Sequence, residues 1–163
     1  MADGFRSKPG LHLGGILVRK GYITETQLIS ALEEQKRTKE LLGEILVRRG
    51  HVTEEQLTYA LAVRFRMPLI VLKSFQIDWE VAKKFGTTLV IEHRCFPLDE
   101  DEETLTVAIT NPLDAQLKSE LGARVGMKRI NFVLVTPQEM RVAMEQYRHK
   151  VIDQIQSKLK KRE

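Results

Sequence analysis

A helical sequence pattern occurs twice near the amino end of this chain, and no other feature constrains the fold as strongly. The two copies are LGGILVRKGYITETQLISALEEQ, from Leu13, and LGEILVRRGHVTEEQLTYALAVR, from Leu42. Identical residues recur at an offset of 29 positions through most of the pattern. One unit of this size cannot bury a core alone, so neighbouring copies pack on one another. We therefore expect one four-helix unit with approximate internal symmetry.

Each copy is predicted to form two short helices separated by a glycine turn. Apolar residues lie three and four positions apart, which is the spacing of one helix face. In the first copy Gly21 interrupts this spacing, and Thr24 with Gln27 forms the pattern of a capping box at the start of the second helix. The corresponding residues of the second copy are Gly50, Thr53 and Gln56.

After Arg66 the sequence alternates between runs typical of strands and runs typical of helices. MPLIVL indicates a strand or an extended linker, CFPLDE and TLTVAIT indicate two strands around an acidic turn, and INFVLVT indicates another strand. WEVAKKFG after Asp78, NPLDAQLKSELGARVG after its opening turn, and PQEMRVAMEQY from Pro137 indicate helices. This alternation predicts a small mixed sheet covered by helices.

The sequence thus predicts an α+β chain with a repeated helix-pair unit followed by a small mixed α/β sheet subdomain. We expect four segments, which are a flexible leader at 1–11, the tandem-repeat helical unit at 12–66, the α/β subdomain at 67–148 and a basic amphipathic helix at 149–163.

Composition and charge indicate where in the cell the protein is expected and which partners are not expected. No apolar run approaches the length of a membrane span, and the amino terminus lacks the apolar core of a signal peptide, so we expect a cytoplasmic protein. The net charge of +4 is carried by residues 148–163, which leaves the rest of the chain charge-balanced. Nucleic-acid-binding domains usually present a basic folded face, so neither DNA nor RNA is an expected partner.

Sequence motifs for catalysis and for metal binding are missing. The histidines His12, His51, His93 and His149 have no metal-ligand spacing, and the single cysteine, Cys95, is expected to be a packed thiol rather than a nucleophile. Gly10 and Gly15 have the offset of a phosphate-binding loop, but Ile16 stands where its lysine is required. The acidic cluster from Asp99 to Glu103 fits a solvated turn. We expect no enzyme activity, no metal and no required cofactor.

A leucine and a glycine open the first helix of each copy, at Leu13-Gly14 and Leu42-Gly43. Glycine within a helix costs about 1 kcal/mol relative to alanine, so another interaction must offset this cost. Two explanations stay open at this point. Glycine permits either a close helix contact or the approach of a flat ligand to the backbone.

The repeat resembles the motif of a known family. A unit from His12 to Gln35, the five-residue spacer KRTKE and a second unit from Leu41 to Arg64 are similar to the cyclic di-GMP-binding N-terminal domain of type II secretion and type IV pilus assembly ATPases. The downstream segments from MPLIVL to VTPQEMRVAMEQY resemble the rest of that domain. In that family each motif copy holds one half of the symmetric dinucleotide.

The resemblance implies a set of ligand-binding positions in this chain. In the first copy they are His12, Leu13, Gly14, Leu17, Val18, Gly21, Ile23, Leu28, Leu32 and Gln35, and in the second Leu42, Gly43, Leu46, Val47, Gly50, Val52, Leu57, Leu61 and Arg64. Five positions depart from the family pattern. His12 and Leu41 replace arginines, Arg64 replaces a glutamine, and Tyr22 and His51 replace aliphatic residues.

The expected function is therefore that of a regulatory domain that binds cyclic di-GMP and relays its presence to secretion or pilus machinery proteins. The alternative is a protein-docking module of such a system that no longer binds nucleotide.

At 150–163 an apolar stripe of Val151, Ile152, Ile155 and Leu159 precedes basic residues. It either extends the preceding helix on its own domain, or pairs with a partner or a second copy. Membrane insertion is not expected from so narrow a stripe.

Overall fold

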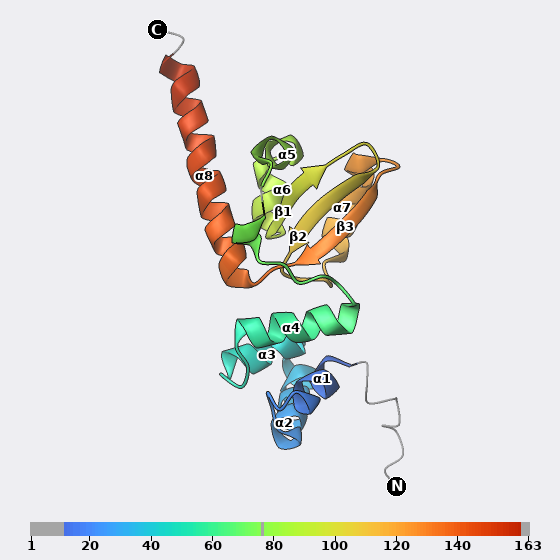
Figure 1. Ribbon diagram of the computed structural model, residues 1–163. Helices are drawn as coiled ribbons and strands as arrows, with labels where there is room; N and C mark the ends of the chain where they lie inside the picture. Colours follow the sequence, from blue (N-terminus) through green and yellow to red (C-terminus); the bar gives the residue numbers. More distant parts are fainter. Residues whose placement is uncertain (1–11, 76, 161–163) are drawn as a thin grey trace. The chain divides into compact units, whose positions relative to one another are not determined.

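The computed structural model describes residues 12–75 and 77–160, which form two compact units. The first unit ends at Met67 and the second begins at Pro68. Figure 1 shows the first unit as helical and the second as a small sheet with helices around it, which confirms the predicted α+β class. The predicted leader at 1–11 and the last three residues of the predicted tail lie outside the described residues.

The first unit contains the four helices expected from the repeat. They are α1 (Leu13–Arg19), α2 (Glu25–Thr38), α3 (Leu42–Arg48) and α4 (Glu54–Phe65). Both predicted capping boxes are present, at Thr24 with Gln27 and at Thr53 with Gln56. In the first box the Gln27 backbone N–H donates to Thr24 Oγ1 over 3.2 Å, and the Thr24 N–H donates to Gln27 Oε1 over 2.9 Å. Each box satisfies two backbone donors that a helix start leaves unpaired.

Glycine is required at the turn inside each copy because the backbone there is left-handed. Gly21 has a φ of +71° and Gly50 a φ of +69°. The next residue of each turn donates its N–H back into the first helix, from Tyr22 to the Leu17 carbonyl over 3.0 Å and from His51 to the Leu46 carbonyl over 2.9 Å. These bonds close the helix ends in the manner of a glycine C-cap.

The two copies pack across one another rather than side by side. The first helix of one copy contacts the second helix of the other, so α1 packs on α4 and α2 packs on α3. The shared core is drawn from both copies and consists of Leu13, Ile16, Leu17, Ile23, Ala31, Ile45, Leu46, Val52 and Ala60. This exchange of partners gives the approximate twofold arrangement that the repeat predicts.

The second unit is a three-stranded mixed sheet with helices. Its elements are η1 (Leu72–Ser74), α5 (Trp79–Phe85), α6 (Thr87–Glu92), β1 (Cys95–Glu100), β2 (Thr104–Ile109), α7 (Ala115–Val125), β3 (Arg129–Leu134) and α8 (Pro137–Lys160). Strand β1 pairs with β2 antiparallel, and β2 pairs with β3 parallel. The parallel connection needs a crossover, which α7 provides behind the sheet in Figure 1. Asp101 shapes the acidic turn by accepting the N–H groups of Glu103 and Thr104.

Two segments of this unit differ from the simple sequence pattern. MPLIVL forms only an isolated bridge between Leu69 and Leu134 before η1, so it is closer to an extended linker than to a full strand. Helix α6 had no predicted counterpart because its β-branched residues resemble those of a strand. Gly86, with a φ of +88°, separates it from α5, and burial of Leu89 and Val90 holds it against the core.

Aromatic side chains from distant parts of the sequence meet in the core of the second unit. The Trp79 and Phe96 ring centroids lie 5.6 Å apart, and those of Phe96 and Tyr147 lie 5.5 Å apart, both edge to face. Each arrangement is one that aromatic pairs favour. The cluster ties α5 and α8 to β1.

Candidate functional site

The opening glycine of each copy contacts a leucine from the second helix of the same copy. A Cβ atom at Gly14 would lie 2.5 Å from Leu28 Cδ1, and one at Gly43 would lie 2.8 Å from Leu57 Cδ1. A Cβ atom at either position would require the end of the facing leucine side chain to shift, so each glycine lets a leucine of the second helix lie close to the first. The structure thus supports the helix-contact explanation for the glycine of each copy.

Most predicted apolar ligand-binding residues belong to the core of the first unit or lie at its edge. The buried ones are Leu13, Leu17, Ile23, Leu46 and Val52. The half-buried ones are Val18, Leu28, Leu32, Leu42, Val47, Leu57 and Leu61. Gly14 and Gly43 are buried, whereas Gly21 and Gly50 are exposed at their turns. The surface that a ligand can reach is therefore formed by the half-buried side chains and the turn backbone.

The predicted polar residues lie at the ends of the helices. His12 is exposed at the N-cap of α1 and makes no capping hydrogen bond through its side chain, and Leu41 occupies the same position before α3. Gln35 is half-buried and donates from Nε2 to the Glu40 carbonyl over 2.9 Å. Arg64 is half-buried, with its guanidinium 5.1 Å from the centroid of the Phe65 ring.

A polar contact also joins the two copies. Gln27 Nε2 lies 3.2 Å from His51 Nδ1, which connects the start of α2 to the glycine turn of the second copy. The residue equivalent to His51 in the first copy is Tyr22, which packs at the edge of the core.

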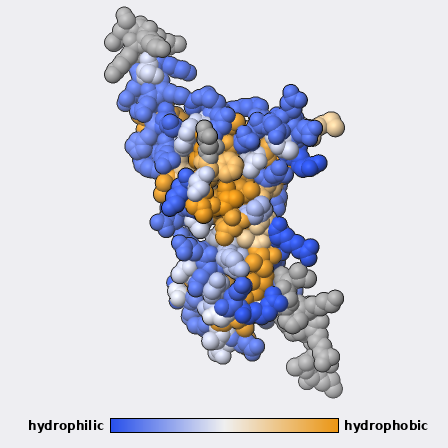
Figure 2. Space-filling model, viewed as in Figure 1, coloured by the Kyte–Doolittle hydropathy of each residue, from blue (hydrophilic) through white to orange (hydrophobic). Residues whose placement is uncertain are grey.

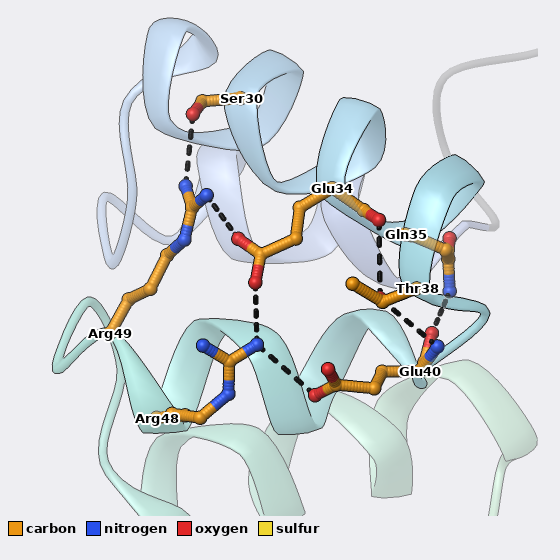
Figure 3. Close-up of polar contacts among 7 residues, drawn as sticks. All are labelled: Ser30, Glu34, Gln35, Thr38, Glu40, Arg48 and Arg49. Atoms are coloured by element: carbon orange, nitrogen blue, oxygen red, sulfur yellow. Dashed lines mark hydrogen bonds and ion pairs between the residues drawn. The ribbon is translucent and has the colours of Figure 1, made fainter.

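Figure 3 shows a network of charged side chains between α2 and α3 that sequence reasoning did not identify. Glu34, with a side chain only 10% exposed, accepts a hydrogen bond from Arg48 Nη2 over 2.5 Å and forms a second ion pair with Arg49. Arg48 Nη2 also donates to Glu40 Oε2 over 3.1 Å, and Arg49 Nη1 donates to Ser30 Oγ over 2.9 Å. The hydrogen bond from Arg48 lowers the pKa of the Glu34 carboxyl from its usual range.

The contact between α1 and α4 has a different chemistry at the equivalent positions. Lys20 takes the place of Arg49 and Tyr59 that of Ser30, and Lys20 Nζ lies 4.9 Å from the centroid of the Tyr59 ring. Val63, exposed to 45%, takes the place of Glu34. The sequence repeat could have revealed this difference between the two contacts, because the carboxylate of Glu34 in one copy aligns with the aliphatic Val63 in the other.

The single cysteine, Cys95, lies in surroundings typical of a packed residue. Cys95 is fully buried, and burial raises the pKa of its thiol to about 12, which fits the packed thiol that was predicted. Over residues 12–75 and 77–160, His, Cys, Asp and Glu side chains form no group of three that could hold a metal ion. In the same ranges no helix has both the length and the apolar character needed to cross a membrane.

The predicted tail continues α8 without a break. Beyond Arg148 this helix is largely exposed up to Lys158, and its surface on the face in Figure 2 is mostly hydrophilic. Val151 packs at the edge of the core, whereas Ile152 and Ile155 are exposed to 42% and 54%. The side chain of Leu159, the last residue of the predicted stripe, lies outside the described residues.

Comparison with protein families and with curated proteins gives two related matches. A family model of the MshEN domain matches residues 65–154, which is more than half of the chain. The type IV pilus assembly ATPase PilB of Myxococcus xanthus (strain DK1622) is 30% identical over 135 residues, which is 83% of this chain and 24% of that protein. The chain thus spans about a quarter of the length of this curated relative.

Solved structures with the same fold include MshE and XpsE. The structure of MshE with cyclic di-GMP (cdg) matches with a TM-score of 0.74 and 26% identity, over 83% of this chain and 98% of that one. The N-terminal domain of XpsE matches with a TM-score of 0.62 and 14% identity, over 87% and 97% of the two chains, which is a likeness of fold. The MshE match is longer than either unit of this chain alone, so it extends over parts of both.

Proposed function

Because this chain belongs to the MshEN domain family, we propose that its first unit binds cyclic di-GMP through the two repeat copies and relays the ligand's presence to a protein partner. The observation that carries this proposal is the match over both units to the structure of MshE with cyclic di-GMP. The family model matches residues 65–154, so the resemblance of the repeat at 12–64 is a separate line of support.

The cross-packed arrangement of the first unit suits a ligand made of two equal halves. Each copy contributes a Leu-Gly helix start, a glycine turn with exposed backbone and a set of half-buried aliphatic side chains. A guanine base can lie on such an apolar surface, and the backbone N–H and carbonyl groups near the turns can form hydrogen bonds to its edge. His12 and Gln35 in the first copy, and Arg64 in the second, supply the polar side chains.

Two helix starts lack the arginine that the family places there. A charge-assisted contact contributes about 1.5 to 3 kcal/mol, so losing one lowers affinity about ten- to hundredfold. His12 and Leu41 occupy these positions, and Arg64 adds a cation at the end of the second copy. These substitutions favour the second candidate function, a docking module of a secretion or pilus system that has kept the fold without the nucleotide.

The proposed role is regulatory and non-catalytic, in the cytoplasm. The relation to a pilus assembly ATPase makes components of secretion or pilus machinery the proposed partners.

Exposed Ile152 and Ile155 on α8 provide a stripe on which such a partner, or a second copy of this chain, could pack. Deleting residues 150–163 should then change the oligomeric state or partner capture while leaving the melting temperature nearly unchanged. A drop of several degrees would assign the stripe to the core instead.

Titration calorimetry with cyclic di-GMP tests the ligand, with cyclic di-AMP and GTP as controls. Selective heat with cyclic di-GMP supports the proposal. The lack of any selective heat up to high micromolar ligand would favour the docking module instead.

Restoring the family arginine gives a second, graded test. His12→Arg and Leu41→Arg should each tighten cyclic di-GMP binding about tenfold, because each adds one charge-assisted contact at an exposed helix start. Ile29→Arg is the matched control, since Ile29 is exposed on α2 outside the motif and the substitution adds the same charge. Equal tightening by all three variants would indicate non-specific attraction of the anionic ligand.

A further inference from the structure

We propose that Arg48 of the second repeat copy is a positioning residue for Gln35 of the first, holding its carboxamide ready for the dinucleotide; this inference rests on the proposed ligand site. Neither Arg48 nor its two carboxylate partners belongs to the ligand-binding set that the resemblance implies. The proposal adds a direct link between the two halves of the site.

The orientation of Gln35 is set by one hydrogen bond. Its Nε2 donates to the Glu40 carbonyl over 2.9 Å, in the spacer between the two copies. This bond directs one end of the carboxamide toward the spacer and turns Oε1 the other way. A carboxamide oxygen accepts hydrogen bonds, so it suits the N1–H and N2–H donors of a guanine edge.

Glu40 can orient Gln35 only if the spacer itself is fixed, and Arg48 fixes it. As Figure 3 shows, Arg48 Nη2 bridges Glu40 Oε2 at 3.1 Å and Glu34 Oε1 at 2.5 Å. Glu34 precedes Gln35 on α2, so Arg48 holds both the helix that carries Gln35 and the segment that Gln35 contacts. Thr38 strengthens the same segment, since its hydroxyl donates to the Glu34 carbonyl and accepts the Glu40 N–H.

The second copy has no such arrangement. Arg64 stands in place of Gln35 and Val63 in place of Glu34, so the bridging carboxylate is missing there. The two halves of the proposed site are therefore unequal, and the half that ends in Gln35 is organised before the ligand arrives. Preorganising one polar side chain lowers the entropic cost of binding, which corresponds to about three- to tenfold in affinity.

The test compares Arg48→Met with Arg49→Met. Both variants remove one cation from Glu34, but Arg49 contacts Ser30 rather than Glu40, so only Arg48→Met removes the bridge between Glu34 and the spacer. We expect Arg48→Met to weaken cyclic di-GMP binding about three- to tenfold and Arg49→Met to leave affinity nearly unchanged. In a Gln35→Ala background, Arg48→Met should have no further effect, since the residue it positions is gone.

A measurement without ligand separates this inference from the proposed function. The Gln35 Nε2 proton that donates to the Glu40 carbonyl should exchange slowly with water and give a shifted NMR signal in the unchanged chain and in Arg49→Met, whereas in Arg48→Met it should exchange faster and its signal should move toward that of a free glutamine side chain. Unaltered Gln35 signals in folded Arg48→Met would overturn the positioning role, as would equal loss of affinity in both arginine variants.

Other outcomes are also decisive. If the unchanged chain binds no cyclic di-GMP, the proposed function fails, and the Gln35 signals still decide whether Arg48 positions this side chain. If Arg48→Met does not fold, Glu40→Gln serves instead, because it weakens the same bridge at a carboxylate that is 40% exposed. Its Gln35 Nε2 proton should show the same faster exchange and the same move of its signal, and an unchanged signal would overturn the inference.

Discussion

The two units of this chain differ in the ionisable side chains that they bury, because the first buries a carboxylate, whereas the second buries a histidine as well as a carboxylate, Glu100, which pairs with Lys84 and Lys128. In the first, the Glu34 carboxylate lies between Arg48 and Arg49. In the second, His93, with a side chain 8% exposed, lies between Asp114 and Glu120, with Nδ1 2.8 Å from Asp114 Oδ2 and Nε2 3.4 Å from Glu120 Oε1. A buried charge persists only when opposite charges compensate its desolvation, and the clusters around Glu34 and His93 each join two helical segments.

The cores of the units also differ in how far apart their residues lie in the sequence. The core of the first unit is contained between Leu13 and Ala60 and is assembled from adjacent helices. That of the second joins Leu72 to Tyr147 through a sheet. Repetition therefore lets one short pattern specify the first unit, whereas the second depends on contacts that local pattern does not encode.

The largest expected effect is a loss of stability in the core of one unit and not in that of the other. Phe96 is fully buried between Trp79 and Tyr147, and Phe96→Ala should destabilise the second unit by about 3 to 5 kcal/mol. Trp79 is the only tryptophan, so denaturant unfolding followed by its fluorescence reports on this unit. Ile45→Ala, in the core of the first unit, is the matched variant and should mainly affect the helical signal. Equal shifts of the Trp79 transition would contradict two separate cores.

A smaller effect comes from glycines with different backbone geometry in the two units. Gly50 is left-handed, so Gly50→Ala should cost about 1 to 2 kcal/mol although its Cβ would meet no atom within 4 Å. Gly122 lies inside α7 without positive φ and with equal space, so Gly122→Ala should stabilise by about 1 kcal/mol. Thermal melts of both variants measure the two signs. A stabilising Gly50→Ala would show that the turn is not held left-handed in solution.

The third prediction uses the opposite charges of Glu34 and His93, and its effects should be the smallest. The hydrogen bond to Asp114 raises the pKa of His93 above its usual 6.5. The stability that protonated His93 contributes is therefore fully present below pH 6.5 and is lost as the pH rises through the raised pKa. Arg48 lowers the pKa of Glu34 below its usual 4.5, so its contribution is present above 4.5 and is lost as pH falls through the lowered pKa.

Melting temperatures of His93→Gln and Glu34→Gln across pH measure these contributions. The deficit of His93→Gln should be largest below pH 6.5 and shrink toward alkaline pH, and that of Glu34→Gln should be largest above pH 4.5 and shrink in acid. Parallel curves for the two variants would show that the compared clusters do not titrate as opposites.

Sequence pattern predicted the elements whose signals are local. The capping boxes at Thr24 and Thr53, the glycine turns, the helix start at Pro137 and the three strands of the sheet all follow from residues close together in the chain. Helix α6 was missed because its β-branched residues have weak helical preference, and only burial against β1 decides its conformation. The ligand-binding set was likewise drawn from local motif positions and stays a prediction.

By itself the sequence determined that two similar helix pairs exist and that they must share a core, since periodic apolar residues, glycine turns and caps are encoded within each copy. Tertiary structure alone decided how the copies pair, with α1 on α4 and α2 on α3, and what each contact contains. Glu34 and Arg48 are 14 residues apart, and nothing in either copy specifies that their side chains meet. Charged pairs between helices depend on how the helices pack in three dimensions, and a one-dimensional pattern does not contain that geometry.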